Sequence, residues 1–375
     1  MIRPEQLYNH LQQHGVDFYT GVPDSLLKDF LTYVQVHAPA DKHIITANEG
    51  LAMGLAAGYH FSTGKLPVVY LQNSGLGNII NPLTSLADKE MYAVPMLMMI
   101  GWRGRPGVKD EPQHHKMGRI TVALLEALEV PYFIIDEDEK ACFEKMDEAI
   151  SIATNGQMPV ALIFPENVFE AVPAIRQESK YSLEREMVIK EIIEHLTGTE
   201  TVICTTGKIG REFYAMNVLA GNKITKYLLC AGAMGHANHI ALGINLSSEE
   251  KVIMLDGDGA LLMHLGGLST IAHHSKAGFV HVVINNGCHE SVGGQPTEAF
   301  LSDLCGIAAA SGYASTTGIN TNNELQQWLT DGLQNGGKQF VEIRVNTMGR
   351  KDLGRPTGTP AEWKNNFSTA NQTPK

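Results

Sequence analysis

Oxygen-bearing side chains follow two neighbouring apolar segments in the C-terminal half of the sequence. One segment runs into Asp-Gly-Asp-Gly at 256–259, and the next runs into Asn-Asn-Gly at 285–287. A helical pattern between them predicts strand, helix, strand, which brings Asp258 and Asn286 to the same edge of a parallel sheet. Carboxylate, carboxamide and backbone carbonyl oxygens suit Mg²⁺ or Ca²⁺. Either motif alone would be an ordinary turn, but the pair predicts a metal site.

The intervening segment is expected to form one helix, and the flanking glycines have a separate use. Gly257 and Gly259 would let a phosphate group approach the backbone closely. The helix is indicated by apolar residues at helical spacing: Leu261, Leu265, Leu268 and Ile271.

A second candidate is Glu49, where a predicted strand meets a predicted helix. The segment 46–59 that contains it is rich in Gly and Ala. Small residues permit close packing against a buried cofactor or a subunit interface. The alternative is a glutamate favoured by the dipole at the start of an ordinary helix.

A basic segment lies between residues 101 and 119. It is rich in Gly and Pro and is expected to be a loop at the ligand-binding edge of a sheet. Arginine grips phosphonate or carboxylate groups bidentately, and lysine adds a point charge, so the segment suits a multiply charged anion. The alternative is a solvated basic loop. Its cations are Arg103, Arg105, Lys109, Lys116 and Arg119, opposed by Asp110 and Glu111.

The pairing of Gly-Asp-Gly with Asn-Asn resembles the cofactor signature of thiamine-diphosphate (ThDP) enzymes. The resemblance implies that Asp258, Asn286 and the backbone carbonyl of Cys288 hold Mg²⁺, which holds the diphosphate. Choosing Asn286 over Asn285 rests on placing one extra residue of the gap in the turn at 273–277. The resemblance also implies that Glu49 contacts the pyrimidine ring of the cofactor and activates it.

Further cofactor contacts follow from the same resemblance. Met234 would be the hydrophobic wedge that bends ThDP, and the carbonyl of Gly232 could accept from its amino group. For Met234 the alternative is an ordinary core methionine. Thr206, which follows a predicted strand, could donate a hydrogen bond to the diphosphate, as Gly257 and Gly259 would allow from the backbone.

Within that family the chain resembles the compact decarboxylases that lack a middle domain, above all the phosphonopyruvate decarboxylases. The segments that carry this resemblance are 19–25, 72–78, 101–114 and 286–297. The implied reaction is ThDP- and Mg²⁺-dependent, non-oxidative decarboxylation of 3-phosphonopyruvate to phosphonoacetaldehyde and CO₂, in phosphonate biosynthesis.

The resemblance also assigns substrate and catalytic residues. Ser25 occupies a position where some decarboxylases carry an active-site Asp or Ser. His114 and His115 resemble a histidine pair near the reacting centre, and imidazole suits proton transfer near neutral pH. Their alternative is a surface histidine pair. The substrate anion would be bound by Ser25, Arg103, Arg105 and Lys109.

Three rival functions stay open. Sulfopyruvate decarboxylase would use the same cofactor on a sulfonate, which has one charge fewer and needs fewer cations. An acetolactate-synthase-like carboligase would condense the product with another keto acid. A non-catalytic nucleotide sensor could use the Gly-rich turns, but binding alone does not need Glu49.

These residues must be positioned by an α/β fold with two ThDP-binding domains, each a parallel sheet flanked by helices. We expect a pyrimidine-binding domain at 1–170, a polar linker at 171–186 and a diphosphate-binding domain at 187–375 that ends in a loose polar tail. A long surface loop is the alternative to the linker. The strands are expected at 44–45, 68–71, 96–100, 132–135, 161–164, 201–204, 252–255, 280–284 and 339–345.

Composition agrees with a globular enzyme that acts on a small molecule. The 375 residues include 29 Lys and Arg against 40 Asp and Glu, a net charge of −11, which argues against nucleic acid or an anionic membrane as the partner. No apolar run reaches the ~18 residues of a membrane span. The five scattered cysteines fit a reducing cytoplasm. The family resemblance implies a homodimer or higher oligomer with the cofactor at the subunit interface.

Overall fold

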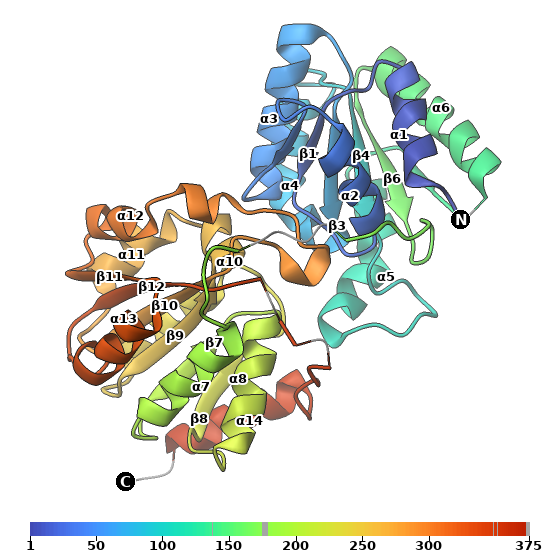
Figure 1. The fold of residues 1–375 in the computed structure, drawn as a ribbon. Coiled ribbons are helices and arrows are strands. Elements are labelled where there is room, and N and C mark those ends of the chain that lie inside the picture. The colour runs from blue at the N-terminus through green and yellow to red at the C-terminus, as the bar shows by residue number, and fades with distance from the viewer. Residues whose placement is uncertain (137, 175–178, 348, 351, 373–375) are drawn as a thin grey trace. The chain divides into compact units, whose positions relative to one another are not determined.

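The structure is a computed structural model that describes residues 1–136, 138–174, 179–347, 349–350 and 352–372. The chain divides into two compact units, residues 1–176 with 289–296 and residues 177–288 with 297–375, and each is described by itself (Figure 1). Four residues of the expected linker, 175–178, lie outside the described residues.

The first unit contains a six-stranded sheet in the order β2-β1-β3-β4-β6-β5. Every pairing in it is parallel. Central strands β3, β4 and β6 are buried almost throughout, because helices cover both faces, and they are therefore continuous apolar runs. The strands are β1 (Tyr19–Gly21), β2 (His43–Ile45), β3 (Val68–Gln72), β4 (Met96–Gly101), β5 (Tyr132–Ile134) and β6 (Pro159–Phe164).

Alternate side chains of this sheet face two different cores. Val68, Tyr70 and Leu97 pack with α1, α2 and α6, whereas Val69 and Met98 pack with α3, α4 and α5. Figure 1 shows α1 and α6 on one side of the strands and α3 and α4 on the other. The helices are α1 (Pro4–Gln13), α2 (Lys28–His37), α3 (Glu49–Thr63), α4 (Leu76–Pro82), α5 (Pro112–Ala127) and α6 (Glu139–Gly156).

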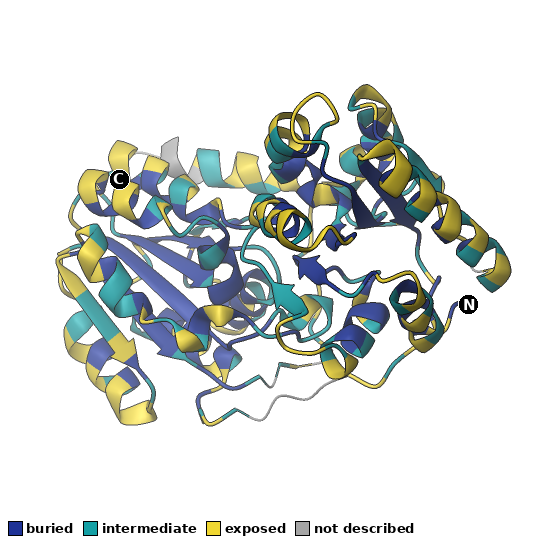
Figure 2. Cartoon of the chain, turned by 90° about the horizontal axis from the view of Figure 1, so that it is seen from above, coloured by how far each residue is buried: buried dark blue, intermediate teal, exposed yellow. Residues whose placement is uncertain are grey.

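The second unit repeats this plan with a sheet in the order β11-β12-β10-β9-β7-β8. All of its pairings are also parallel. Figure 2 shows its central strands buried and the outer faces of its helices exposed. The strands are β7 (Thr201–Cys204), β8 (Lys226–Leu229), β9 (Val252–Gly257), β10 (Phe279–Asn285), β11 (Ser315–Ile319) and β12 (Gln339–Arg344).

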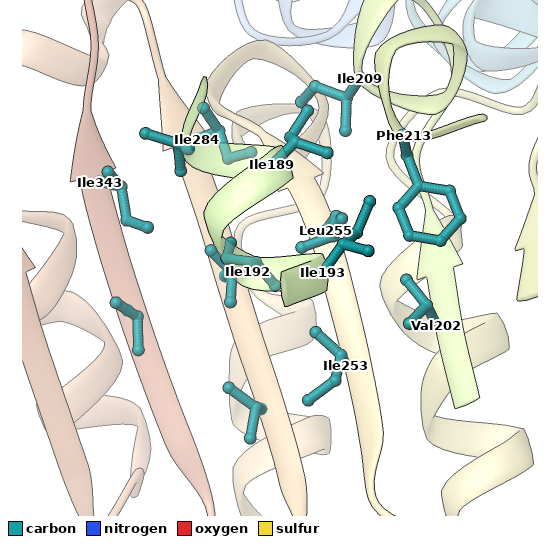
Figure 3. Packing of buried hydrophobic residues seen from close by; sticks show 14 of the residues in the cluster. Ile189, Ile192, Ile193, Val202, Ile209, Phe213, Ile253, Leu255, Ile284 and Ile343 are labelled. Carbon is teal, nitrogen blue, oxygen red and sulfur yellow. The ribbon is translucent and has the colours of Figure 1, made fainter. Parts of the chain in front are cut away.

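Helices on both faces bury this second sheet. Ile189, Ile192 and Ile193 of α7 pack over β9 and its neighbours, together with Phe213 of α8 (Figure 3). The opposite face packs against α9, α10, α11 and α12. The helices are α7 (Arg185–His195), α8 (Lys208–Leu219), α9 (Ala237–Ser247), α10 (Asp258–Met263), α11 (Gly267–His274), α12 (Leu304–Ser311), α13 (Asn322–Gln327) and α14 (Pro360–Gln372).

The predicted fold class is confirmed: each unit is a parallel sheet flanked by helices. Three strands of the structure were not predicted: β1, β8 and β11. β1 has only three residues, and β8 and β11 carry partly exposed or polar side chains at the ends of their sheet, so none of them is a long apolar run.

Three expectations about single elements were wrong. The helix after Asp258 is two helices, α10 and α11, because the chain turns at His264 and Gly266. The basic segment is a loop only as far as Glu111, because Pro112 begins α5 and carries the rest of the segment into a helix.

The C-terminal tail was the third error. Residues 364–372 belong to α14 and are not a loose tail. Thr359 Oγ1 accepts from the amide of Glu362, and the Glu362 carboxylate accepts from the amide of Thr359, which closes the first turn. Phe367 of this mostly polar helix packs against the second core.

Candidate active site

Glu49 begins α3, at the point where the chain leaves β2. Asn48 caps the helix by accepting from the amide of Gly50 at 2.8 Å. Glu49 is 5% exposed although it is acidic. Burial raises the pKa of Glu49 above its ordinary value. A proton on this carboxyl is therefore held more tightly than on a surface glutamate.

Two residues of the next Gly-rich turn fix the Glu49 carboxyl. Asn78 Nδ2 donates to Glu49 Oε2 at 2.7 Å. Gly75 lies against the same carboxyl, since a Cβ atom there would be 2.3 Å from Glu49 Oε1. A larger residue at this position would force the Glu49 side chain to shift, so the Asn-Ser-Gly turn after β3 helps to set the position of this carboxyl.

In the second unit, Asp258 and Asn286 follow neighbouring strands. β9 and β10 pair in parallel with Ile284 opposite Gly257, so both strands end at the same level. Asp258 is 4% exposed, Asn286 is 4% exposed, and Thr297 Oγ1 donates to Asp258 Oδ2 at 2.5 Å. Burial raises the pKa of Asp258 to about 6. A buried carboxylate beside a buried carboxamide is a donor set that fits a hard divalent cation, whose charge would offset this burial.

Next to Asn286 in the chain, Asn285 belongs to a hydrogen-bonded group with Glu342 and Arg344. Asn285 Nδ2 donates to Glu342 Oε1 at 2.7 Å, and Asn285 Oδ1 accepts from the amide of Gly287 at 3.0 Å. Arg344 Nε in turn donates to Glu342 Oε1 at 2.9 Å, which balances a glutamate that is 2% exposed. Asn286 Oδ1 likewise accepts from the amide of Cys288 at 3.2 Å, so both asparagines hold this turn, and Glu342 anchors it through Asn285.

The expected diphosphate and wedge residues lie on two further strand-to-helix loops of this unit. Met234 and Gly232 are partly exposed in the loop between β8 and α9. Thr206 Oγ1 donates to the carbonyl of Ala231 at 3.0 Å, which ties the loop after β7 to that after β8. The neighbouring Thr205 Oγ1 is buried and has no hydrogen-bond partner among the residues described. An unpaired hydroxyl here fits an anionic group that is absent from the structure.

Gly257 and Gly259 are the glycines of the turn that leads into α10. Both are at the junction of β9 with α10, and a Cβ atom on Gly257 would lie 3.3 Å from Ile209 Cδ1. Gly257 N donates to Asp256 Oδ1 at 3.0 Å. The residues expected to bind the metal and the diphosphate therefore all lie at strand-to-helix junctions of the second unit.

In the first unit, Arg103 is paired and is not an isolated cation. Its Nε and Nη2 atoms donate to both oxygens of Asp110, at 2.8 and 2.5 Å. Its Nη1 atom donates to Ser25 Oγ at 2.9 Å. The structure thus brings Ser25 and Arg103, two of the expected substrate residues, into direct contact, while the Asp110 carboxylate neutralises the charge of Arg103.

The other expected residues of this region surround that pair. Arg105 is partly exposed and Lys109 is exposed on the turn between β4 and α5. His115 Nε2 contacts the carbonyl of Asp110 at 2.8 Å. His114 Nδ1 is buried and unpartnered within the described part of the chain, and burial together with the Arg103 charge lowers the pKa of His114 to about 4.

Sequence reasoning missed four supporting residues: Asn78, Asp110, Thr297 and Glu342. Asn78, Asp110 and Thr297 each contact an expected site residue, 29, 7 and 39 positions away in the chain. Glu342 contacts Asn285, the neighbour of the expected metal ligand Asn286. The spacing gave no signal for them, except that Asp110 lies within the basic segment as one of its two acids.

Comparison with known proteins finds a matching domain family for each of the two units. The profile described as "Thiamine pyrophosphate enzyme, N-terminal TPP binding domain" matches residues 4–124, and the corresponding C-terminal TPP binding domain matches residues 209–343. The chain belongs to the thiamine pyrophosphate enzyme family. The expected family and its ThDP cofactor are confirmed at this level.

Relatives narrow the branch of the family. The chain is 33% identical to a phosphonopyruvate decarboxylase of Streptomyces viridochromogenes, over 100% of this chain and 96% of the relative. It is 31% identical to that of Streptomyces hygroscopicus, over 98% and 93%. A sulfopyruvate decarboxylase of Methanosarcina acetivorans is 29% identical over 86% of each chain. The protein is thus an enzyme of the ThDP-dependent decarboxylase branch.

No helix in the described ranges is long and apolar enough to cross a membrane.

Proposed function

We propose that the enzyme decarboxylates 3-phosphonopyruvate to phosphonoacetaldehyde and CO₂, with ThDP and Mg²⁺, as a step of phosphonate biosynthesis. The observation that carries the proposal is similarity over practically the whole chain to two phosphonopyruvate decarboxylases, against 86% of the chain for the sulfopyruvate relative. Arg105 and Lys109 supply positive charge for the phosphonate and carboxylate groups, within a protein whose net charge is −11, and Arg103, whose charge Asp110 balances, adds hydrogen-bond donors.

Each expected cofactor residue has a role in this proposal. Bound ThDP supplies the electron sink that makes loss of CO₂ possible. Asp258, Asn286 and the carbonyl of Cys288 hold Mg²⁺, and Thr206, Gly257 and Gly259 line the diphosphate. Gly232 and Met234 support the rest of the cofactor.

The chain's own groups move the protons. Glu49 holds a proton at the pyrimidine nitrogen, and its burial favours the protonated form that this contact needs. Ser25 and Arg103 orient the substrate, with Arg103 fixed by Asp110. His114 or His115 donates a proton to the carbon that has lost CO₂. His114 is almost entirely neutral at neutral pH, since its pKa is lowered to about 4, so it can donate a proton only from a small protonated population.

The proposal includes a homodimer with the cofactor at the subunit interface. The helix that begins with Glu49 exposes an apolar stripe at helical spacing, which soluble surfaces usually cover. Leu51 is 61% exposed and Phe61 is 57% exposed, with Gly54 and Gly58 between them. The proposal locates the enzyme in the cytoplasm, because its five cysteines are free thiols.

The test compares substrates with the purified protein, ThDP and Mg²⁺. CO₂ release and aldehyde formation are followed with phosphonopyruvate, sulfopyruvate and pyruvate. We expect the highest kcat/KM with phosphonopyruvate, and phosphonoacetaldehyde as the product. A higher kcat/KM with sulfopyruvate would overturn the substrate, and a condensation product with two keto-acid skeletons would establish the carboligase instead.

A further inference from the structure

A second metal site can be built on the first unit, away from any residue assigned above. We propose that His10, His14 and Asp147 bind a divalent transition-metal ion such as Zn²⁺. His10 lies on α1, His14 caps the end of that helix, and Asp147 lies on α6. Within the described ranges, this is the one group of three His, Cys, Asp or Glu residues whose ligand atoms all lie within 4.8 Å of one another.

The three side chains already point at a common centre. Asp147 Oδ1 lies 2.8 Å from His10 Nε2 and 3.0 Å from His14 Nε2. Residues four apart on a helix share one face, so both imidazoles reach α6 together. The His10 ring also stacks on Phe143 of α6, with 4.6 Å between ring centroids and 19° between planes, which fixes its orientation. Little ordering remains for a metal to impose.

The donor set selects the kind of metal. Two imidazole nitrogens with one carboxylate oxygen suit Zn²⁺, Ni²⁺ or Cu²⁺, and three protein ligands leave a position for water. Mg²⁺ prefers oxygen ligands, which are those of Asp258 and Asn286. The two sites therefore differ in the ion they take.

The proposed site is open to solvent. The side chains of His10, His14 and Asp147 are 17%, 38% and 52% exposed, so an ion can enter without movement of the backbone. A bound metal would join α1 to α6, two helices that lie on the same side of the sheet. The competing explanation is that Asp147 only accepts hydrogen bonds from the two rings.

The experiment titrates Zn²⁺ into the full-length protein by calorimetry, with excess Mg²⁺ and ThDP present to occupy the oxygen-ligand site. The variants are His14→Ala and Asp147→Asn, which each remove one ligand. The matched control is His37→Ala, an exposed helical histidine whose ring contacts the carbonyl of Tyr33 at 2.9 Å. Binding by the wild-type protein should saturate at one Zn²⁺ at this site and persist in the control.

Loss of one ligand should weaken Zn²⁺ binding at least about 10-fold, because loss of an outer contact alone costs about 10- to 100-fold. Zn²⁺ should also raise the melting temperature of the wild type and the control more than that of either variant. Absence of saturable Zn²⁺ binding by the wild type would overturn the proposal. So would equal affinity in the wild type and both variants, which would leave the hydrogen-bonded trio as the explanation. Neither readout depends on decarboxylation.

Discussion

Glu49 owes its chemical properties to burial and to the hydrogen bonds that its carboxylate accepts, one of them from Asn78. Burial raises its pKa, and the bond from Asn78 acts in the opposite direction by stabilising the carboxylate. The two effects together keep the carboxyl able to hold and release a proton. Glu49 and Asn78 therefore work as a pair, and the segment 46–59 that points to Glu49 does not contain Asn78.

Asn78→Ala should raise the pKa of Glu49 further, because the carboxylate loses this donor. Because the proposed role of Glu49 needs its protonated form, the limb of the kcat profile at which Glu49 loses its proton should move to higher pH. The value of kcat should also fall roughly 10-fold or more, since a hydrogen bond to a charged group contributes about 1.5–3 kcal/mol. The measurement is kcat against pH. The control is Asn81→Ala, at an exposed position of α4, the helix that also contains Asn78. An unchanged profile would show that Asn78 does not tune Glu49.

Asp24 offers a test of burial without catalysis. It is fully buried, its Oδ2 accepts from the amides of Leu26 and Leu27, and burial raises its pKa from 3.8 to about 6. The folded state therefore binds this proton more tightly than the unfolded state does. The stability from that proton is fully present below about pH 4 and is lost as pH rises through about 6.

Asp24→Asn should remove this pH dependence. Between about pH 4 and pH 7 the free energy of unfolding of the wild type should fall relative to the variant by at most about 3 kcal/mol. Denaturant unfolding of both proteins at each pH measures the difference. A constant difference across this range would contradict a raised pKa for Asp24.

For single residues, the sequence predicts the place in the fold better than it predicts side-chain contacts. Asp258 and Asn286 could be placed at one edge because strand order and parallel pairing follow from the alternating pattern, and the register agrees. Pairing of Arg103 with Asp110 could not, because a count of cations in the basic segment says nothing about which of them already has a partner.

Among the elements, β12 does more than complete its sheet. It carries Glu342, whose carboxylate accepts hydrogen bonds from Asn285 of β10 and from Arg344 of β12 itself. The turn that contains Asn286 is thus held from the neighbouring strand. We therefore expect Glu342 to be a positioning residue for the proposed metal site.

Glu342→Ala should weaken Mg²⁺ binding about 10-fold, as loss of an outer contact does at other metal sites. The Mg²⁺ concentration for half-maximal activity should rise while kcat at saturating Mg²⁺ changes little. Glu342→Gln is the matched control, because its carbonyl oxygen still accepts from Asn285. A fall in kcat that saturating Mg²⁺ does not restore would assign Glu342 a different role.

Two helical regions were predicted incorrectly from the sequence, and each error has a physical cause. The pattern of Leu261 and Leu268 predicted one helix because it describes one buried face, and it does not register the backbone turn at Gly266. α14 was missed because its sequence is mostly polar, although Phe367 packs against the second core.

At the scale of the whole molecule, the alternation of strands and helices was sufficient to predict two parallel α/β units, since buried parallel strands are continuous apolar runs. Association between chains follows from neither pattern nor composition. The stripe on α3 became visible only when Leu51 and Phe61 were found exposed.

Leu51→Glu combined with Phe61→Glu should convert the proposed dimer into monomers, because two charges would be buried at the interface. ThDP affinity should fall with it if the cofactor lies between subunits. Sedimentation velocity and ThDP titration measure both. Leu219→Glu, at a 77% exposed apolar residue of α8, is the control. A double variant that sediments like the wild type would move the interface away from α3.

The most direct test of the account is Glu49→Gln, assayed for ThDP binding and for CO₂ release from phosphonopyruvate in the same preparation. Glutamine keeps the shape of the side chain but cannot exchange the proton, so we predict near-normal ThDP affinity and a loss of turnover of about 10²- to 10⁴-fold. Glu148→Gln, on the exposed side of α6, should leave both unchanged. A Glu49→Gln enzyme that binds ThDP and releases CO₂ at the wild-type rate would contradict the account.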